Sequence, residues 1–189
     1  MPRSSAIPRE LPLSRLRSTW KKDPEGVAID LLRLGLGAVW AINLLFIVAP
    51  TNEYFSTFQG VASGFASSSL GGPGIANLVA SNATFFAWAI AVLTGYLAVA
   101  FLAGITTRLA CLVGGVASLA FLLTQFTTTF VLTGGGTDVG PHPLYLLIYF
   151  ILFSGGAGRY LSFDGWVWRS GRARLPALAR RLCAPQPQP

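Results

Sequence analysis

The sequence predicts an all-α membrane protein, a four-transmembrane-helix bundle with a long outer loop between the first helix and the second. Two features of the sequence, its composition and the distribution of its apolar residues, lead to this fold class. Hydrophobic residues make up 52% of the 189 residues and charged residues only 11%, whereas a soluble globular domain carries about 25% charged residues. The apolar residues also form long blocks, as expected of membrane-spanning helices. An ordinary soluble enzyme, a coiled coil and a disordered chain are therefore excluded.

The first predicted span runs from residue 27 to residue 49. It follows Asp23, Pro24 and Glu25, which supply an N-cap, a proline suited to the first helical position and an acid in the first turn. A helix of about 23 residues is roughly 34 Å long, enough to cross a hydrocarbon core of about 30 Å.

Asp30 and Arg33 lie in the first two turns of this span, and their spacing allows an inner ion pair. We expect Arg33 to extend along the helix to the headgroups at the inner membrane face. The functional alternative is contact between this pair and an anion or a quinone carbonyl inside the bundle.

Three further apolar blocks predict the remaining spans, at residues 83–103, 109–131 and 143–158. A short turn, 104–108, joins the second span to the third. A glycine-rich loop, 132–141, precedes the fourth span and cannot continue a helix.

The outer loop between the first and second spans, residues 50–82, carries two conflicting signals. Its glycine and serine content predicts irregular structure, whereas its aromatic residues argue against free solvation. Two placements follow, one on the outer membrane surface and one folded over the mouth of the bundle. The aromatic residues are Tyr54, Phe55, Phe58 and Phe65.

The net charge of +7 is concentrated in a basic N-terminal segment, 1–26, and a basic, aromatic C-terminal tail, 159–189. These flank the four-helix transmembrane domain, 27–158. Arg108 lies in the short turn, and the other two loops contain no Lys or Arg. Four spans place all these cations on one side, which the positive-inside rule makes cytoplasmic.

We therefore expect a multi-pass protein of the inner membrane, with both termini in the cytoplasm facing anionic lipid. Nucleic acid is not expected as a partner, because the cations flank apolar blocks instead of covering a folded polar surface.

Small residues on the second and third spans predict close helix packing. Gly114 and Ser118 form a small-xxx-small pair on the third span, and Gly95 lies on a similar stripe of the second.

A second group of residues predicts a quinone-binding site at the outer mouth. His142, Tyr145 and Tyr149 share one face of the fourth span. Asp138 precedes them in the glycine-rich loop, and Gln125 lies near the outer end of the third span. An imidazole, a carboxylate to orient it and phenols to stack a ring suit proton-coupled quinone chemistry. The alternative is a capped helix start with interfacial tyrosines.

No metal site, disulfide framework or covalently bound cofactor is expected. Cys111 lies in an apolar block and Cys183 in the basic tail, and His142 is the single histidine. The sequence also lacks nucleotide-binding, nucleophile-elbow and zinc-protease motifs. Catalytic residues are therefore not assigned, and enzyme activity stays open.

Three segments, taken in their order and spacing, resemble the DoxX/DoxD family of membrane proteins over about residues 30–168. Residues 32–37 resemble its Arg-x-Gly-x-Gly pattern, 102–109 its Leu-x-Gly-x-x-Thr-Arg-Leu turn, and 157–164 its Gly-Arg-x-x-Ser-x-Asp motif. Many relatives carry a glutamate about ten residues before the Gly104 position. Thr94 stands there in this chain, so no role of that acid is transferred.

The resemblance implies an inner-membrane protein of redox metabolism, because the best-known members resemble the large subunit of thiosulfate:quinone oxidoreductase. Two functions remain open. One is a non-catalytic membrane subunit that anchors a larger complex, in contact with quinone, other redox subunits or further copies of itself. The other is a catalytic subunit of the thiosulfate:quinone oxidoreductase type. A small-solute transporter is a third alternative, against which the absence of a clearly broken helix or paired intramembrane charges argues.

Overall fold

The computed structural model describes residues 19–49, 53–64, 73–125, 142–158 and 160–169. These residues are mainly α-helical, and none of them forms a β-strand. The predicted all-α class is therefore confirmed for this part of the chain.

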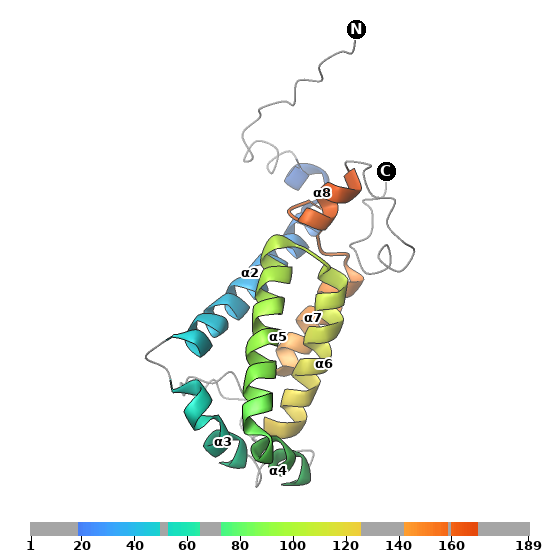
Figure 1. Ribbon diagram of the computed structural model, residues 1–189. Helices are drawn as coiled ribbons and strands as arrows, with labels where there is room; N and C mark the ends of the chain where they lie inside the picture. Colours follow the sequence, from blue (N-terminus) through green and yellow to red (C-terminus); the bar gives the residue numbers. More distant parts are fainter. Residues whose placement is uncertain (1–18, 50–52, 65–72, 126–141, 159, 170–189) are drawn as a thin grey trace.

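Four helices correspond to the four predicted apolar blocks. They are α2 (Pro24–Val48), α5 (Ala83–Ala103), α6 (Thr107–Gln125) and α7 (His142–Ser154). In Figure 1, α5, α6 and α7 run alongside one another, and α2 crosses α5 at an angle. Most of the contacts between helices are made by the pairs α2–α5 and α6–α7.

The predicted start of the first helix is confirmed. Asp23 is the N-cap of α2, and its Oδ1 accepts a hydrogen bond from the Gly26 backbone N–H at 2.9 Å. Pro24 begins the helix, where a missing N–H has no intrahelical partner to lose, and Glu25 lies in the first turn.

The segment predicted as an outer loop contains two helices, so the prediction of irregular structure is wrong for these residues. They are α3 (Tyr54–Gly64) and α4 (Pro73–Ser81). The glycine and serine content does not prevent these helices, because each helix buries part of its apolar surface. Phe58 of α3 and Ala80 of α4 share a buried cluster with Ala87 of α5. Both helices pack at one end of the bundle (Figure 1), which fits the second predicted placement.

The bundle has two ends, and different elements lie at each of them. At one end lie the start of α2, the turn between α5 and α6, and the short helix α8 (Phe163–Arg169), which together are called the α8 end below. The opposite end, where α3 and α4 lie, is called the α3–α4 end.

A buried apolar cluster fills the space between the long helices. α2 contributes Leu36 and Trp40, α5 contributes Leu97 and Phe101, and α7 contributes Tyr149 among others. The cluster orients α2 and α7 against α5 and sets the position of the polar groups at the α8 end.

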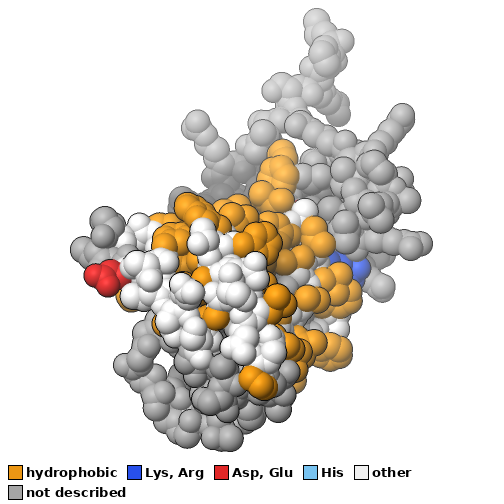
Figure 2. Space-filling model, turned by 60° about the horizontal axis from the view of Figure 1, so that its bottom comes forward, with side chains coloured by type: hydrophobic (Ala, Val, Ile, Leu, Met, Phe, Trp, Pro, Cys, Tyr) orange, Lys and Arg blue, Asp and Glu red, His pale blue; other side chains and the backbone are white. Residues whose placement is uncertain are grey.

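Two helices, α2 and α5, are long and apolar enough to cross a membrane; α6 and α7 are shorter apolar helices within the described residues. Only 22% of the most apolar window of α2 and 39% of that of α5 are buried inside the protein, unlike the largely buried core helix of a soluble domain. Seen from the α3–α4 end, hydrophobic side chains cover much of the described surface, and charged side chains lie only at its margins (Figure 2).

Candidate functional site

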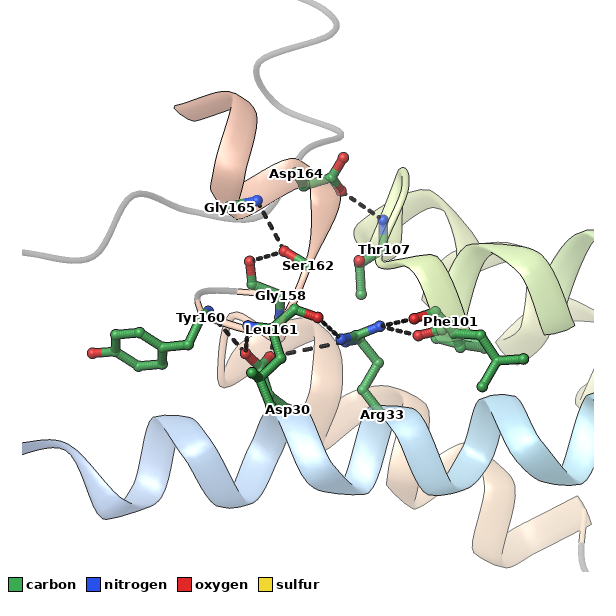
Figure 3. Close-up of polar contacts among 11 residues, drawn as sticks. Asp30, Arg33, Phe101, Thr107, Gly158, Tyr160, Leu161, Ser162, Asp164 and Gly165 are labelled. Atoms are coloured by element: carbon green, nitrogen blue, oxygen red, sulfur yellow. Dashed lines mark hydrogen bonds and ion pairs between the residues drawn. The ribbon is translucent and has the colours of Figure 1, made fainter. Parts of the chain in front are cut away.

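Three segments from distant parts of the sequence, within residues 30–33, 101–107 and 158–165, meet at the α8 end (Figure 3). α2 supplies Asp30 and Arg33, and the start of α6 supplies Thr107. The connection from α7 into α8 supplies Ser162, and the first turn of α8 supplies Asp164. These five residues are called the polar cluster below. It is the candidate site because it gathers most of the buried charge of the described residues.

Asp30 is fully buried and is held by the connection between α7 and α8. Its Oδ2 accepts hydrogen bonds from the backbone N–H groups of Tyr160 at 2.8 Å and Leu161 at 2.9 Å, and its Oδ1 accepts one from Gly158. Three amide donors replace the water that a carboxylate loses on burial, so this charge is stabilised without solvent.

Arg33 is also fully buried, and its guanidinium binds backbone carbonyls from two elements. Nη1 donates to the carbonyl oxygen of Phe101, in the last turn of α5, and Nη2 donates to that of Leu161 at 2.5 Å. The last carbonyls of a helix have no intrahelical partners and carry negative partial charge, so a cation suits this position. Nε lies 3.9 Å from Oδ1 of Asp30.

The expected position of Arg33 at the lipid headgroups is therefore wrong. The side chain turns inward because the carbonyls at the end of α5 and the Asp30 carboxylate together satisfy its charge within the protein. The predicted anion or quinone contact is not favoured either, since both terminal nitrogens of the guanidinium are already bound to the chain.

Gly104 allows α5 to end where Arg33 reaches it. It adopts a left-handed conformation, with φ of 67°, and closes the C-terminus of α5. A Cβ atom at this position would lie 2.2 Å from Cβ of Ser162 and 3.1 Å from Nη1 of Arg33. Backbone conformation and close packing therefore both require glycine here.

Asp164 links α8 to the beginning of α6. Its Oδ2 accepts a hydrogen bond from the Thr107 backbone N–H at 3.1 Å, so α6 is capped by a residue from another element. The Asp164 backbone N–H donates to the Gly104 carbonyl at 3.0 Å. Burial raises the pKa of the Asp164 carboxyl, while the backbone N–H groups of Thr107 and Thr106 and the charge of Arg33 act in the opposite direction.

Two smaller contacts complete the α8 end. The Ser162 hydroxyl donates to the Gly158 carbonyl and accepts from the Gly165 backbone N–H at 2.9 Å, which stabilises the start of α8. The Tyr160 hydroxyl donates to Oδ2 of Asp23 at 2.7 Å, so the N-cap of α2 is also bound to the connection between α7 and α8.

The polar cluster thus connects the start of α2, the end of α5, the start of α6 and the start of α8. The positive charge of Arg33 attracts the carboxylates of Asp30 and Asp164. Most hydrogen bonds of these three side chains go to backbone groups. Arg33 Nε has no hydrogen-bond partner among the described residues, but the other polar contacts of the cluster hold the helix ends in a fixed geometry.

The predicted quinone-binding residues are only partly brought together. His142 and Tyr145 are buried at the start of α7, with ring centroids 5.9 Å apart in an edge-to-face arrangement. Phe121 of α6 stacks on the imidazole, with ring centroids 5.0 Å apart. Gln125 is the last residue of α6, but its side chain lies outside the described residues, as does Asp138.

Tyr149 has a different environment from the one predicted. Its hydroxyl accepts a hydrogen bond from Nε1 of Trp40 at 3.0 Å, and its ring stacks with that of Phe101, with centroids 5.9 Å apart. It therefore belongs to the buried core between α2, α5 and α7, where these contacts already occupy the phenol.

The predicted packing residues differ in how closely they are packed. A Cβ atom on Gly114 would lie 2.5 Å from Cζ of Tyr149, so α6 and α7 cross closely there. Ser118, one turn further along α6, is fully buried. At Gly95 the nearest atoms belong to Leu44 at 3.8 Å, an ordinary van der Waals distance.

Sequence reasoning missed the capping role of Asp164 and the contact between Tyr160 and Asp23. The signal was the charge itself, because a charged residue in or beside an apolar block requires a partner. Within the described residues there is no group of three potential metal-ligating side chains, and Cys111 is a buried free thiol.

No family model, curated protein or solved structure matches this chain.

Proposed function

We propose that the chain is a multi-pass membrane protein with four crossings, and that it serves as a non-catalytic subunit that anchors or stabilises a larger inner-membrane complex. The DoxX/DoxD resemblance supports placing that complex in redox metabolism. The proposal includes cytoplasmic termini, which the distribution of basic residues favours.

The observation that carries the membrane part of the proposal is the exposure of large apolar side chains on all four long helices. Leu45 of α2, Phe85 of α5, Val116 of α6 and Phe150 of α7 are each between 65% and 71% exposed. Water disfavours such surfaces by roughly 25 cal/mol for each Å² of apolar area, whereas lipid does not. A hydrocarbon environment therefore fits this molecule better than water does.

The non-catalytic part of the proposal rests on how the buried polar groups are used. Asp30 and Arg33 bind backbone groups, and Asp164 caps a helix. These contacts give the residues a structural role and leave few interior groups for chemistry.

Membrane fractionation followed by purification in mild detergent tests this proposal. We expect the chain to stay in the membrane pellet after alkaline carbonate extraction and to co-purify with other membrane subunits in a fixed ratio. Release by carbonate would contradict the membrane assignment. A chain that purifies alone and oxidises thiosulfate with quinone as acceptor would contradict the anchoring role and favour the catalytic alternative.

A quinone contact near the start of α7 is a second candidate, favoured by the burial of His142 between two aromatic rings. We propose that its imidazole binds a quinone oxygen beside Tyr145. Quinone extracted from purified wild type should exceed that from His142→Ala, with Cys111→Ala as a buried control. Equal quinone in wild type and His142→Ala, or none in wild type, would reject this contact.

A further inference from the structure

The α8 end carries exposed aromatic side chains, although the rest of that end is organised around buried polar contacts. Phe163 is 50% exposed and Trp166 is 52% exposed, and their ring centroids lie 5.7 Å apart on α8. Trp20, just before α2, is 48% exposed. Tryptophan, which has an apolar ring and a polar N–H, concentrates where a membrane meets water, and the Phe163 ring adds apolar surface beside Trp166.

The position of these aromatic residues is fixed by the contacts of the polar cluster. The Asp164 backbone N–H binds the Gly104 carbonyl, so α8 lies directly on the turn between α5 and α6. Asp164 is 5% exposed, while its neighbour Phe163 is exposed. One side of α8 is therefore held by the bundle, and Phe163 and Trp166 are left on the other side.

Exposed cations lie at the same end. Lys21 and Lys22 follow Trp20 directly and are exposed. They lie about one turn before Gly26. A Cβ atom built on Gly26 would lie 2.8 Å from the Tyr160 ring, so the start of α2 borders the connection that leads into α8. Glu25 is the exposed acid nearby.

Arg108 adds a third cation at the beginning of α6. Its guanidinium carbon lies 5.4 Å from the centre of the Phe153 ring, and its Nε is buried without a hydrogen-bond partner in the described part of the chain. Unlike Arg33, it has no carboxylate within salt-bridge distance among the described residues. Its charge is therefore not neutralised by these residues.

We propose that the α8 end is a binding surface for anionic phospholipid, in which Phe163, Trp166 and Trp20 enter the boundary between headgroups and acyl chains while Lys21, Lys22 and Arg108 bind phosphate groups. This set of residues favours lipid over a protein partner, because exposed aromatic side chains and basic side chains share one end of the apolar helices. The inference rests on the proposed membrane location and adds a preference for lipid charge.

Lipid titration of the purified full chain in detergent, followed by native mass spectrometry, tests this surface. The probes are phosphatidylglycerol, phosphatidylcholine and inorganic phosphate. We expect phosphatidylglycerol to bind more tightly than phosphatidylcholine, with an affinity that falls as salt rises, and we expect inorganic phosphate not to compete at equal concentration.

Three sets of variants separate the contributions. Lys21→Gln with Lys22→Gln, and Arg108→Gln, should each weaken phosphatidylglycerol binding by about fivefold for every charge removed. Phe163→Ser with Trp166→Ser should weaken the binding of both lipids and leave the salt dependence of binding unchanged. The matched control is Glu25→Gln, which removes an exposed charge of the opposite sign and should preserve or strengthen binding.

Equal affinity for the two lipids, or unchanged phosphatidylglycerol binding in the cation variants, would overturn the inference. Competition by inorganic phosphate would assign the cations to a soluble anion instead of a lipid. These outcomes are distinguishable from failure of the membrane assignment, because carbonate extraction is scored on the same wild-type protein. A chain that resists extraction but shows no lipid preference would reject only this inference.

Discussion

At the scale of single residues, the central feature is a pair of opposite charges, Asp30 and Arg33, that is fully buried at the α8 end of the bundle. The pair is stable because both partners also bind backbone groups: three N–H groups surround the carboxylate, and carbonyls at the end of α5 receive the guanidinium. Removing one partner would leave the other as an uncompensated buried charge.

The first prediction concerns this pair. Arg33→Met should destabilise the folded protein by about 3–5 kcal/mol, because Asp30 would lose its nearby cation and the carbonyls their donors. Asp30→Asn together with Arg33→Met should cost less than the sum of the two single changes, since the double variant buries no net charge. Unfolding in detergent measures all three, with Lys22→Met as a control that removes an exposed cation. Additive single effects would show that the two charges act independently.

The second prediction compares two glycines from the motif-like segments. Gly104→Ala should destabilise the protein by more than about 1 kcal/mol, because the residue has positive φ and its added methyl group would meet Ser162. Gly35→Ala is the control, since nothing lies within 4 Å of its added Cβ and alanine favours a helix by about 1 kcal/mol. Thermal unfolding should therefore rank Gly35→Ala at or above wild type and Gly104→Ala below it. The opposite order would place Gly104 outside the packed turn.

The sequence allowed the spacing of Asp30 and Arg33 to be recognised but not the direction of their side chains. Helical spacing is a local property, so it predicted a possible pair. The carbonyls and N–H groups that bind the pair come from residues up to 131 positions away, and only the folded chain brings them to α2. The same reason explains why the capping of α6 by Asp164 was missed.

At the scale of helices, α6 and α7 cross closely where Gly114 faces Tyr149. The absent side chain of glycine lets the phenol approach the α6 backbone, and Trp40 then reaches its hydroxyl. A larger residue at this position would push the two helices apart.

The third prediction follows from this crossing. Gly114→Leu should destabilise the bundle by at least about 1–3 kcal/mol, the usual cost of overpacking. Leu112→Ala should have little effect, since that side chain is 49% exposed on the same helix. Thermal unfolding in detergent should show a clear loss for the first variant and almost none for the second. Equal stability of the two variants would mean that Gly114 faces away from α7, toward lipid.

Helix α2 shows which elements a sequence can specify well. Its N-cap, first-turn proline and apolar length are all local signals, and its start is where they predicted. The helices α3 and α4 show the opposite case. Their glycine and serine content indicates a loop, and they are helical because Phe58, Ala62 and Ala80 are buried at the α3–α4 end.

At the scale of the whole molecule, the two ends of the bundle have different characters. Charged and polar residues fasten the helix ends at the α8 end, whereas α3 and α4 pack by apolar contacts at the other. The length and hydropathy of α2 and α5 suit a membrane span. The candidate quinone residues could be predicted only as a group on one helix face, because the packing of Tyr149 against Trp40 depends on a second helix.

In the topology that we propose, the bundle crosses the membrane with α3 and α4 outside and the α8 end inside. Paired reporter fusions at Gly64, in α3, and at Pro189, the last residue, measure it most directly. We predict an extracytoplasmic signal at Gly64 and a cytoplasmic signal at Pro189, because four crossings put all the flanking cations on one side, whereas three would put the two tails on opposite sides. A cytoplasmic signal at Gly64, or an extracytoplasmic signal at Pro189, would contradict it.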